Sequence, residues 1–394
     1  MLLHTPLPRS SARRSYWQTP PGSALALAAS EAAHQHDGLL VVASHDGQSA
    51  RRLRRELAFF AGEMRVDLFP DWETLPYDRF SPHPDIISER IASLYRLPTA
   101  RRGILVVPVA TLMQRLAPRS HITGSGLALD KGQKLVIESE QQRLQSVGYR
   151  HVSQVTEPGD FAVRGGLIDI YPMGAPLPYR IELLDEEVDS IRSFDPETQR
   201  SIEPVDAIRL LPAREYPTTE EAAREVRSHL RERFPIDVRR CPLYQDMRQG
   251  VAPSGIEYYL PLFFGHTETL FDYLRDEALI LIDRGALDAA ETFHQQTAER
   301  YEQRAHDIER PILPPADIQL SPGELRQRLN QRPCIEIVGK DHRHAVDTGS
   351  APAPQVPLKT TAASGRTDLA TWLAGQSGRV LIAADTAGRR EALG

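Results

Sequence analysis

The hydrophobic and polar positions divide most of the chain into two alternating kinds of segment. Short, continuous apolar runs are typical of strands buried on both faces of a parallel sheet. Between them lie longer segments with helical spacing of their apolar residues. The alternation predicts an α/β fold with a parallel sheet. The expected strands are residues 38–44, 66–69, 103–108 and 278–283, and the expected helices are residues 23–34, 48–61, 86–97, 219–234 and 287–306.

A different pattern fills residues 159–212, where short runs of β-forming residues alternate with Gly and Pro turns. Along residues 179–184, a period of two places Tyr179, Ile181 and Leu183 on one face of a strand. We therefore expect a small antiparallel sheet that packs this face over one helix, residues 135–147, which ends at Gly148.

The outward face of the same strand carries Arg180, Glu182 and Leu184. An apolar residue beside an arginine on an exposed face is typical of a protein-docking patch. The alternative is that Leu184 only covers the edge of its own sheet. Residues 159–208 contain eleven acidic residues and four arginines, a net charge of −7 that repels a phosphate backbone and favours a protein partner.

The order of these patterns predicts a discontinuous domain with an insertion. Residues 1–123 form the first half of an α/β domain, and residues 124–208 form the inserted α+β domain. Residues 209–345 return to the first sheet, and residues 346–394 are a linker followed by the start of a further α/β domain. The final helix ends before it can bury a face, so we expect a truncated chain.

The composition is that of a soluble globular protein: 394 residues, 41% hydrophobic, 25% charged, with a net charge of −6. Two cysteines, Cys241 and Cys334, give neither a disulfide framework nor a zinc cluster. No run approaches the roughly 20 apolar residues of a membrane span, and the first residues have no secretion-signal pattern. These features predict a cytoplasmic location, no membrane partner and no metal site.

Candidate nucleotide chemistry is incomplete in two places. Residues 18–25 occupy the position of a phosphate loop and retain Gly22 and Ser23, but no lysine follows, and Pro20 and Pro21 have no amide hydrogen to donate. Asp283 ends an apolar strand where an ATPase holds Mg²⁺, yet no acidic residue follows it. We expect a degenerate nucleotide site that binds no ATP, and no catalytic residues. The alternative is a nucleotide-hydrolysing, helicase-like enzyme with an atypical phosphate loop.

Three other groups of residues have simpler explanations. The acidic block at residues 71–78 suits a capped loop with Trp72 packed down better than a carboxylate pair. His342 and His344 are too isolated for a metal site. The basic run Arg51–Arg55 fits a solvated helix face, and weak DNA contact is the alternative left open.

Three stretches resemble the transcription-repair coupling factor family: Leu-Phe-Pro-Asp-Trp-Glu-Thr-Leu-Pro-Tyr-Asp at 68–78, Ser-Pro-His-Pro-Asp-Ile-Ile-Ser-Glu-Arg at 81–90, and Gly-Asp-Phe-Ala-Val-Arg-Gly-Gly at 159–166. The resemblance extends from about residue 38 to the last residue. It implies a first domain similar to that of the excision subunit UvrB, without its phosphate loop. It also implies that residues 159–208 bind the damage-recognition ATPase UvrA, through the positions matched by Arg164, Arg180 and Leu184. Family members often have Phe at the last of these positions.

The same resemblance implies a role in coupling stalled RNA polymerase to nucleotide excision repair. In the family, the polymerase-binding domain and the ATP- and Mg-dependent DNA translocase motor follow the region seen here. We therefore assign RNA polymerase, DNA and ATP to those segments and not to this chain. A UvrB-type damage loader needs an aromatic hairpin in the first domain, and there is no room for one between Phe69 and Gly103.

Overall fold

The computed structural model describes residues 3–8, 13–124, 126–235, 237–307, 309–352, 371–378, 380, 382 and 386–393. The chain forms two compact units, residues 1–350 and 351–394. In the second unit, helix α15 spans Ala387–Leu393. Most of the expected linker at 350–357 and of the expected strand at 379–384 lies outside the described residues.

The first unit is built on a seven-stranded sheet in which every neighbouring pair of strands is parallel. Four strands of this sheet were predicted from the sequence. Three of them, β2, β4 and β15, are buried along their full length, as continuous apolar runs require, and the fourth, β3 at the edge, is half-buried. In order across the sheet, the strands are β17 (Ala345–Val346), β1 (Arg14–Gln18), β16 (Cys334–Val338), β15 (Leu279–Ile282), β2 (Leu39–Ser44), β4 (Gly103–Pro108) and β3 (Val66–Leu68).

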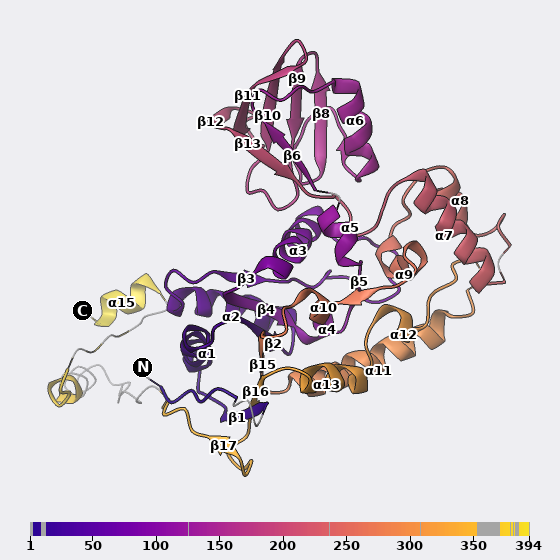
Figure 1. Ribbon diagram of the computed structural model, residues 1–394. Coiled ribbons are helices and arrows are strands. Elements are labelled where there is room, and N and C mark those ends of the chain that lie inside the picture. The colour runs from indigo at the N-terminus through magenta and orange to yellow at the C-terminus, as the bar shows by residue number, and fades with distance from the viewer. Residues whose placement is uncertain are drawn as a thin grey trace. The chain divides into compact units, whose positions relative to one another are not determined.

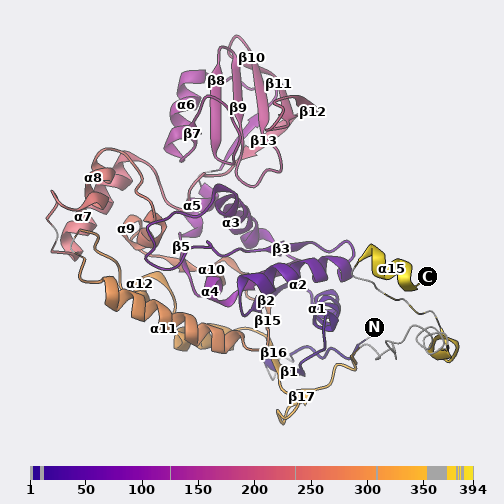
Figure 2. The same ribbon diagram turned by 180° about the vertical axis from the view of Figure 1, so that it is seen from behind.

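Helices cover both faces of this sheet (Figures 1 and 2). On one face, Ala-rich α1 (Ala24–Gln35) and amphipathic α2 (Gly47–Phe60) pack on Leu40, Val42 and their neighbours. The other face carries α4 (Val109–Leu112), α10 (Leu270–Tyr273), α11 (Ala286–Arg304) and α13 (Pro322–Asn330). The mixed α/β class with a parallel sheet is confirmed.

Three strands of this sheet escaped the sequence analysis: β1, β16 and β17. No strand was expected before the helix at residues 23–34, but Trp17 lies in β1 and is fully buried. The segment Cys334–Val338 alternates apolar residues with Glu336, whose carboxylate forms an ion pair with Arg14 of β1 at 2.8 Å. A strand at the side of a sheet keeps polar positions, so its sequence is less conspicuous than that of a central strand.

The β-rich segment forms a module of one six-stranded sheet, a two-stranded pair and one helix, within the first unit. Neighbouring strands of the larger sheet are antiparallel, except β7 with β8. Helix α6 (Ile137–Ser146) lies against this sheet (Figure 1), and its Leu144 joins the core that contains Ile181. The larger sheet, in order, consists of β12 (Ser201–Val205), β11 (Glu187–Phe194), β10 (Tyr179–Leu184), β9 (Leu167–Ile170), β8 (Asp160–Arg164) and β7 (Arg150–His151), and β6 (Leu127–Asp130) pairs with β13 (Ala207–Leu210).

The remaining elements of the main domain lie before and after the β-rich segment in the sequence. The aromatic segment at residues 255–264 packs inside, with Tyr258 and Tyr259 both buried. The remaining elements are α3 (Pro84–Arg96), η1 (Leu97–Thr99), β5 (Arg115–Leu116), α5 (Arg119–Gly124), α7 (Glu220–Arg233), α8 (Pro242–Arg248), η2 (Ile256–Tyr259), α9 (Leu260–Phe263), β14 (Glu268–Thr269) and α12 (Pro315–Ile318).

A fully buried ion pair joins segments that lie before and after the inserted module. Arg90 of α3 donates from Nε to Glu215 Oε1 at 2.6 Å, and both side chains are inaccessible to solvent. The Trp72 indole donates to the same carboxylate at 3.1 Å, and the guanidinium lies over the rings of Phe69 and Trp72. The acidic block around Trp72 is therefore structural, as expected. Its partner Glu215 lies 143 positions away and could not be inferred from the pattern.

Candidate protein-docking site

Two of the predicted docking residues lie at matching positions in the module. Arg164 ends β8 before the two-residue turn Gly165–Gly166, and Leu184 ends β10 before the turn Asp185–Glu186. Strands β8 and β10 are both antiparallel to β9, so they run in the same direction. Both residues therefore lie at the same end of the sheet, separated by the width of one strand.

Leu184 is 69% exposed. This exposure contradicts the alternative in which its side chain covers the edge of the sheet. The turn that follows is acidic, with Asp185, Glu186 and Glu187 in succession, and Asp185 has a left-handed φ of 55°. Leu184 is thus an apolar side chain presented at a hairpin end and surrounded by carboxylates.

Arg180 differs from the expectation of an exposed, available arginine. Its guanidinium donates to both oxygens of Asp169 on β9, at 2.7 and 2.9 Å, and lies 4.9 Å from the centroid of the Phe194 ring. The hydrogen bonds to Asp169 raise the pKa of Arg180 further. Only about a fifth of the side chain is exposed. Arg180 therefore has a structural role in the sheet. A docking role would come in addition to it.

Arg164 is exposed, and its Nη2 donates one hydrogen bond to the carbonyl oxygen of Ser153. This bond orients the arginine while leaving most of its donors available for a partner.

The outward face of the sheet has a covered end and an open end. A small apolar cluster of Val155, Ala162 and Phe194 is buried on it, although the sequence analysis placed no core there. Ala162 is paired with Asp169, and Asp169 with Arg180, so this cluster belongs to the same face as the ion pair. The open end of the face is the one that carries Arg164 and Leu184.

The residues that the sequence suggested for a degenerate nucleotide site, Gly22, Ser23 and Asp283, lie at one edge of the main sheet. Gly22 and Ser23 follow β1, and Asp283 follows β15, so all three lie beyond the carboxyl ends of parallel strands. A weak hydrogen bond between Arg284 and Thr19, at 3.5 Å, spans the two loops. Gly22 has a left-handed φ of 53°, and a Cβ there would meet nothing within 4 Å.

Asp283 contacts two neighbouring groups, the Arg284 amide and the His45 ring. Its Oδ1 accepts from the Arg284 amide at 2.7 Å, and its Oδ2 lies 3.7 Å from His45 Nδ1. Burial raises the pKa of the Asp283 carboxyl, while the Arg284 amide and His45 oppose the shift. The residue after Asp283 is Arg284, which contributes an amide hydrogen bond and no second acidic group.

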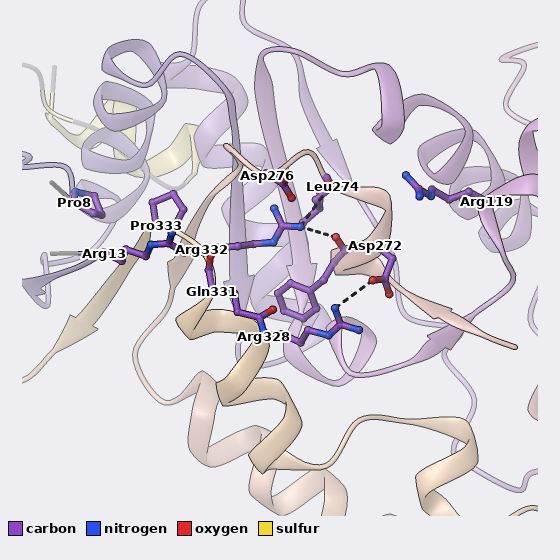
Figure 3. Close-up of a pocket in the computed structure, with 11 residues that line it drawn as sticks. Pro8, Arg13, Arg119, Asp272, Leu274, Asp276, Arg328, Gln331, Arg332 and Pro333 are labelled. Carbon is purple, nitrogen blue, oxygen red and sulfur yellow. Dashed lines mark hydrogen bonds and ion pairs between the residues drawn. The ribbon is translucent and has the colours of Figure 1, made fainter. Parts of the chain in front are cut away.

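A cavity of about 790 Å³ opens beside the amino ends of β1 and β16 (Figure 3). Four arginines line it, but their charge is used internally. Arg332 donates to the carbonyl oxygens of Phe271 and Leu274, and Arg328 forms an ion pair with Asp272 at 3.3 Å. The cavity therefore offers little unpaired charge to a ligand.

Within the described ranges, no three or more His, Cys, Asp and Glu side chains are grouped as a metal ion would need. Also within those ranges, no helix has the length and apolar character to cross a membrane.

Comparison with known families places the module. Residues 127–216 match the family model of the UvrB interaction domain. The chain is 42% identical to the transcription-repair-coupling factor of Haemophilus influenzae over 373 residues, which are 93% of this chain and 32% of that protein. It is 42% identical to the Escherichia coli factor over 381 residues, 95% of this chain and 33% of that protein. The resemblance to the coupling factors is thereby confirmed.

More distant relatives carry the same name. The coupling factor of Bacillus subtilis is 30% identical over 276 residues, covering 66% of this chain and 23% of its own length. The chain spans about a third of the length of the first two curated relatives. The matched module, residues 127–216, includes Arg164, Arg180 and Leu184.

Proposed function

We propose that this chain is the UvrB-like, N-terminal part of a transcription-repair coupling factor and recruits UvrA through the inserted module. In the complete factor, this recruitment would link a stalled RNA polymerase to nucleotide excision repair in the cytoplasm. Contacts with the polymerase, and ATP-driven movement on DNA, would belong to segments of the complete factor that this chain does not span.

One observation carries the proposal. The segment that matches the UvrB interaction domain presents an exposed Leu184 at the same sheet end as Arg164. Arginine is enriched among the residues that carry binding energy at protein interfaces, and an exposed apolar side chain beside it adds area that a partner can bury. Leu184 would fill an apolar pocket, and Arg164 would pair with an acidic group of UvrA. Arg180 would contribute mainly by fixing the face that these residues share.

The experiment is a calorimetric titration of the chain with purified UvrA. We expect saturable binding that Leu184→Ala or Arg164→Ala weakens at least tenfold, equivalent to about 1.4 kcal/mol. Ile202→Ala is the matched control for Leu184, because Ile202 is also an exposed aliphatic residue of the module, 55% accessible, but lies on β12. Arg200→Ala is the control for Arg164, because it is an exposed arginine beside β12.

The possible outcomes test separately whether UvrA is the partner and whether Leu184 and Arg164 form the binding site. Absence of binding by the unaltered chain contradicts recruitment of UvrA. Binding that resists both Leu184→Ala and Arg164→Ala contradicts the site, as does equal weakening by the two controls.

We also infer that the nucleotide site is degenerate and that this chain is not itself a nucleotide hydrolase. The loop with Gly22 and Ser23 has no lysine to neutralise a phosphate, and Asp283 is held by Arg284 and His45. The residues present do not fit ATP and Mg²⁺. Thermal unfolding with and without Mg·ATP tests this inference, because ligand binding to the folded state raises the melting temperature. A saturable rise would favour the hydrolase alternative.

A further inference from the structure

Helix α2 has a basic face that the proposed function does not use. Its buried residues, Ala50, Leu53 and Leu57, lie on one side, which packs against the main sheet. At 100° per residue, the remaining positions include five that project from the opposite side of the helix. These are Arg51, Arg52, Arg54, Arg55 and Phe59, and all five are exposed. We call this side the outer face of α2.

The charge on this face is only partly neutralised. Among the residues that the structure describes, Arg54 and Arg55 have no hydrogen-bond or ion-pair partner. Arg51 forms an exposed ion pair with Glu73, and Arg52 lies 3.9 Å from Glu56. Exposed pairs of this kind contribute at most about 1 kcal/mol, so a polyanion can displace them.

Neighbouring arginines show where the basic face of α2 ends. Arg54 borders a hollow of about 250 Å³ that Arg65 and Arg96 also line. Both of those arginines are bound to Asp67, at 2.8 and 3.1 Å. The unpaired arginine at this hollow, Arg54, therefore belongs to the outer face of α2, whereas the arginines across it are neutralised by Asp67. The positive charge of the outer face stands out in a chain whose net charge is −6.

An exposed aromatic ring continues the arginine row. Phe59 follows Arg51 and Arg55 at intervals of four residues, so the three form one ridge along the helix. The Phe59 side chain is 81% exposed and packs edge-on against Phe60, with ring centroids 5.0 Å apart. Arginines with free donors bind phosphate oxygens, and an aromatic ring beside them can stack on an unpaired base.

We propose that the outer face of α2 is a sequence-independent contact for the phosphodiester backbone of DNA. Arg51, Arg54 and Arg55 bind phosphates, and Phe59 adds a stacking contact where the strand is single. The inference is independent of UvrA docking, because α2 belongs to the main sheet and not to the inserted module. It takes up the alternative that the basic run left open in the sequence, weak contact with DNA.

The test is fluorescence anisotropy of labelled duplex and single-stranded oligonucleotides with the whole chain over a series of salt concentrations. The variant is Arg51→Gln/Arg54→Gln/Arg55→Gln. We expect at least tenfold weaker binding at low salt. The slope of log K against log salt should also become smaller by about two to three, since each phosphate contact contributes about 0.9 to duplex binding.

A second triple variant, Arg224→Gln/Arg231→Gln/Arg239→Gln, removes the same charge from exposed positions on and after α7. It should leave the affinity within about twofold of the original, a change of less than roughly 0.5 kcal/mol. Equal losses in both triple variants, or no DNA binding by the unaltered chain at low salt, overturn the proposal. Poly-glutamate that binds the α2 face more tightly than DNA of matched charge also overturns it, because the face would then fit an acidic protein.

Phe59→Ala distinguishes the two forms of DNA. We expect it to weaken single-strand binding several-fold while leaving duplex binding unchanged, because a base in a duplex is already stacked. Equal single-strand affinity in this variant would remove Phe59 from the proposed contact. The melting temperature of each variant checks folding, and it should not fall because these side chains make no contact with the core.

Discussion

Arg180 and Asp169 face each other across β10 and β9 and are joined by two hydrogen bonds, 2.7 Å from Nε to Oδ1 and 2.9 Å from Nη2 to Oδ2. The Asp169 side chain is 95% buried, whereas Arg180 keeps about a fifth of its surface in contact with solvent. The ion pair lies on the outward face of the sheet and joins β9 to β10 next to the open end that carries Arg164 and Leu184. The most plausible docking arginine by sequence is thus also part of the scaffold.

Arg180→Ala should therefore lower stability as well as UvrA binding. Removing the guanidinium leaves the buried Asp169 carboxylate without its partner, which costs about 1–3 kcal/mol. Urea unfolding measures this loss. Arg192→Ala is the control, since Arg192 is the exposed residue paired with Arg180 on β11, and its loss should cost less than about 0.5 kcal/mol. Equal stability of the two variants would show that the ion pair contributes nothing.

Leu184→Phe should strengthen UvrA binding without changing stability. The side chain is 69% exposed, so a larger ring meets no obstacle within the module. The added apolar area, buried only in the complex, contributes about 1 kcal/mol, or roughly a fivefold change in affinity. Calorimetry measures the affinity and urea unfolding the stability. Weaker binding by Leu184→Phe would mean that the pocket on UvrA is shaped for leucine.

The sequence predicted the fold where burial leaves a strong pattern. Strands β2, β4 and β15 are continuous apolar runs, and each was found close to its expected bounds. Strands β1 and β16 were missed because polar residues interrupt them. Their pairing depends on contacts such as Arg14 with Glu336, which are 322 positions apart.

The docking face was predictable only in part, for the same reason. Alternation along β10 correctly placed Leu184 outward and Ile181 in the core. It could not reveal that Arg180 is bound, because the partner depends on the register of β9 against β10. That register follows from the loop at residues 171–178, whose conformation no periodicity specifies.

Arg90→Ala should destabilise the main domain strongly. It would remove three hydrogen bonds and leave the Glu215 carboxylate buried, with Trp72 as its remaining side-chain donor among the described residues. Breaking a fully buried pair costs about 3–5 kcal/mol. Arg79→Ala is the matched control, because its ion pair with Asp307, at 3.3 Å, is exposed and should contribute less than about 1 kcal/mol. Chemical unfolding with similar losses for the two variants would contradict a special role for Arg90.

The Asp283 carboxyl should make stability depend on pH in a direction opposite to that of most acidic groups. Burial raises its pKa in the folded state above the ordinary value of 3.8, so folding favours the protonated form. The folded state then binds more protons than the unfolded state between these two pKa values, and the contribution of Asp283 to stability falls as pH rises through that interval.

Asp283→Asn removes this titration and keeps an oxygen that can accept from the Arg284 amide. We expect the variant to be more stable than the original chain above the folded-state pKa, with the difference shrinking as pH falls toward 3.8. Urea unfolding at several values from about pH 4 to pH 8 measures the difference. Asp37→Asn, which replaces an exposed carboxyl, is the matched control variant. A lower stability of Asp283→Asn at neutral pH would mean that the charge of Asp283, held by His45, stabilises the fold more than its burial opposes it.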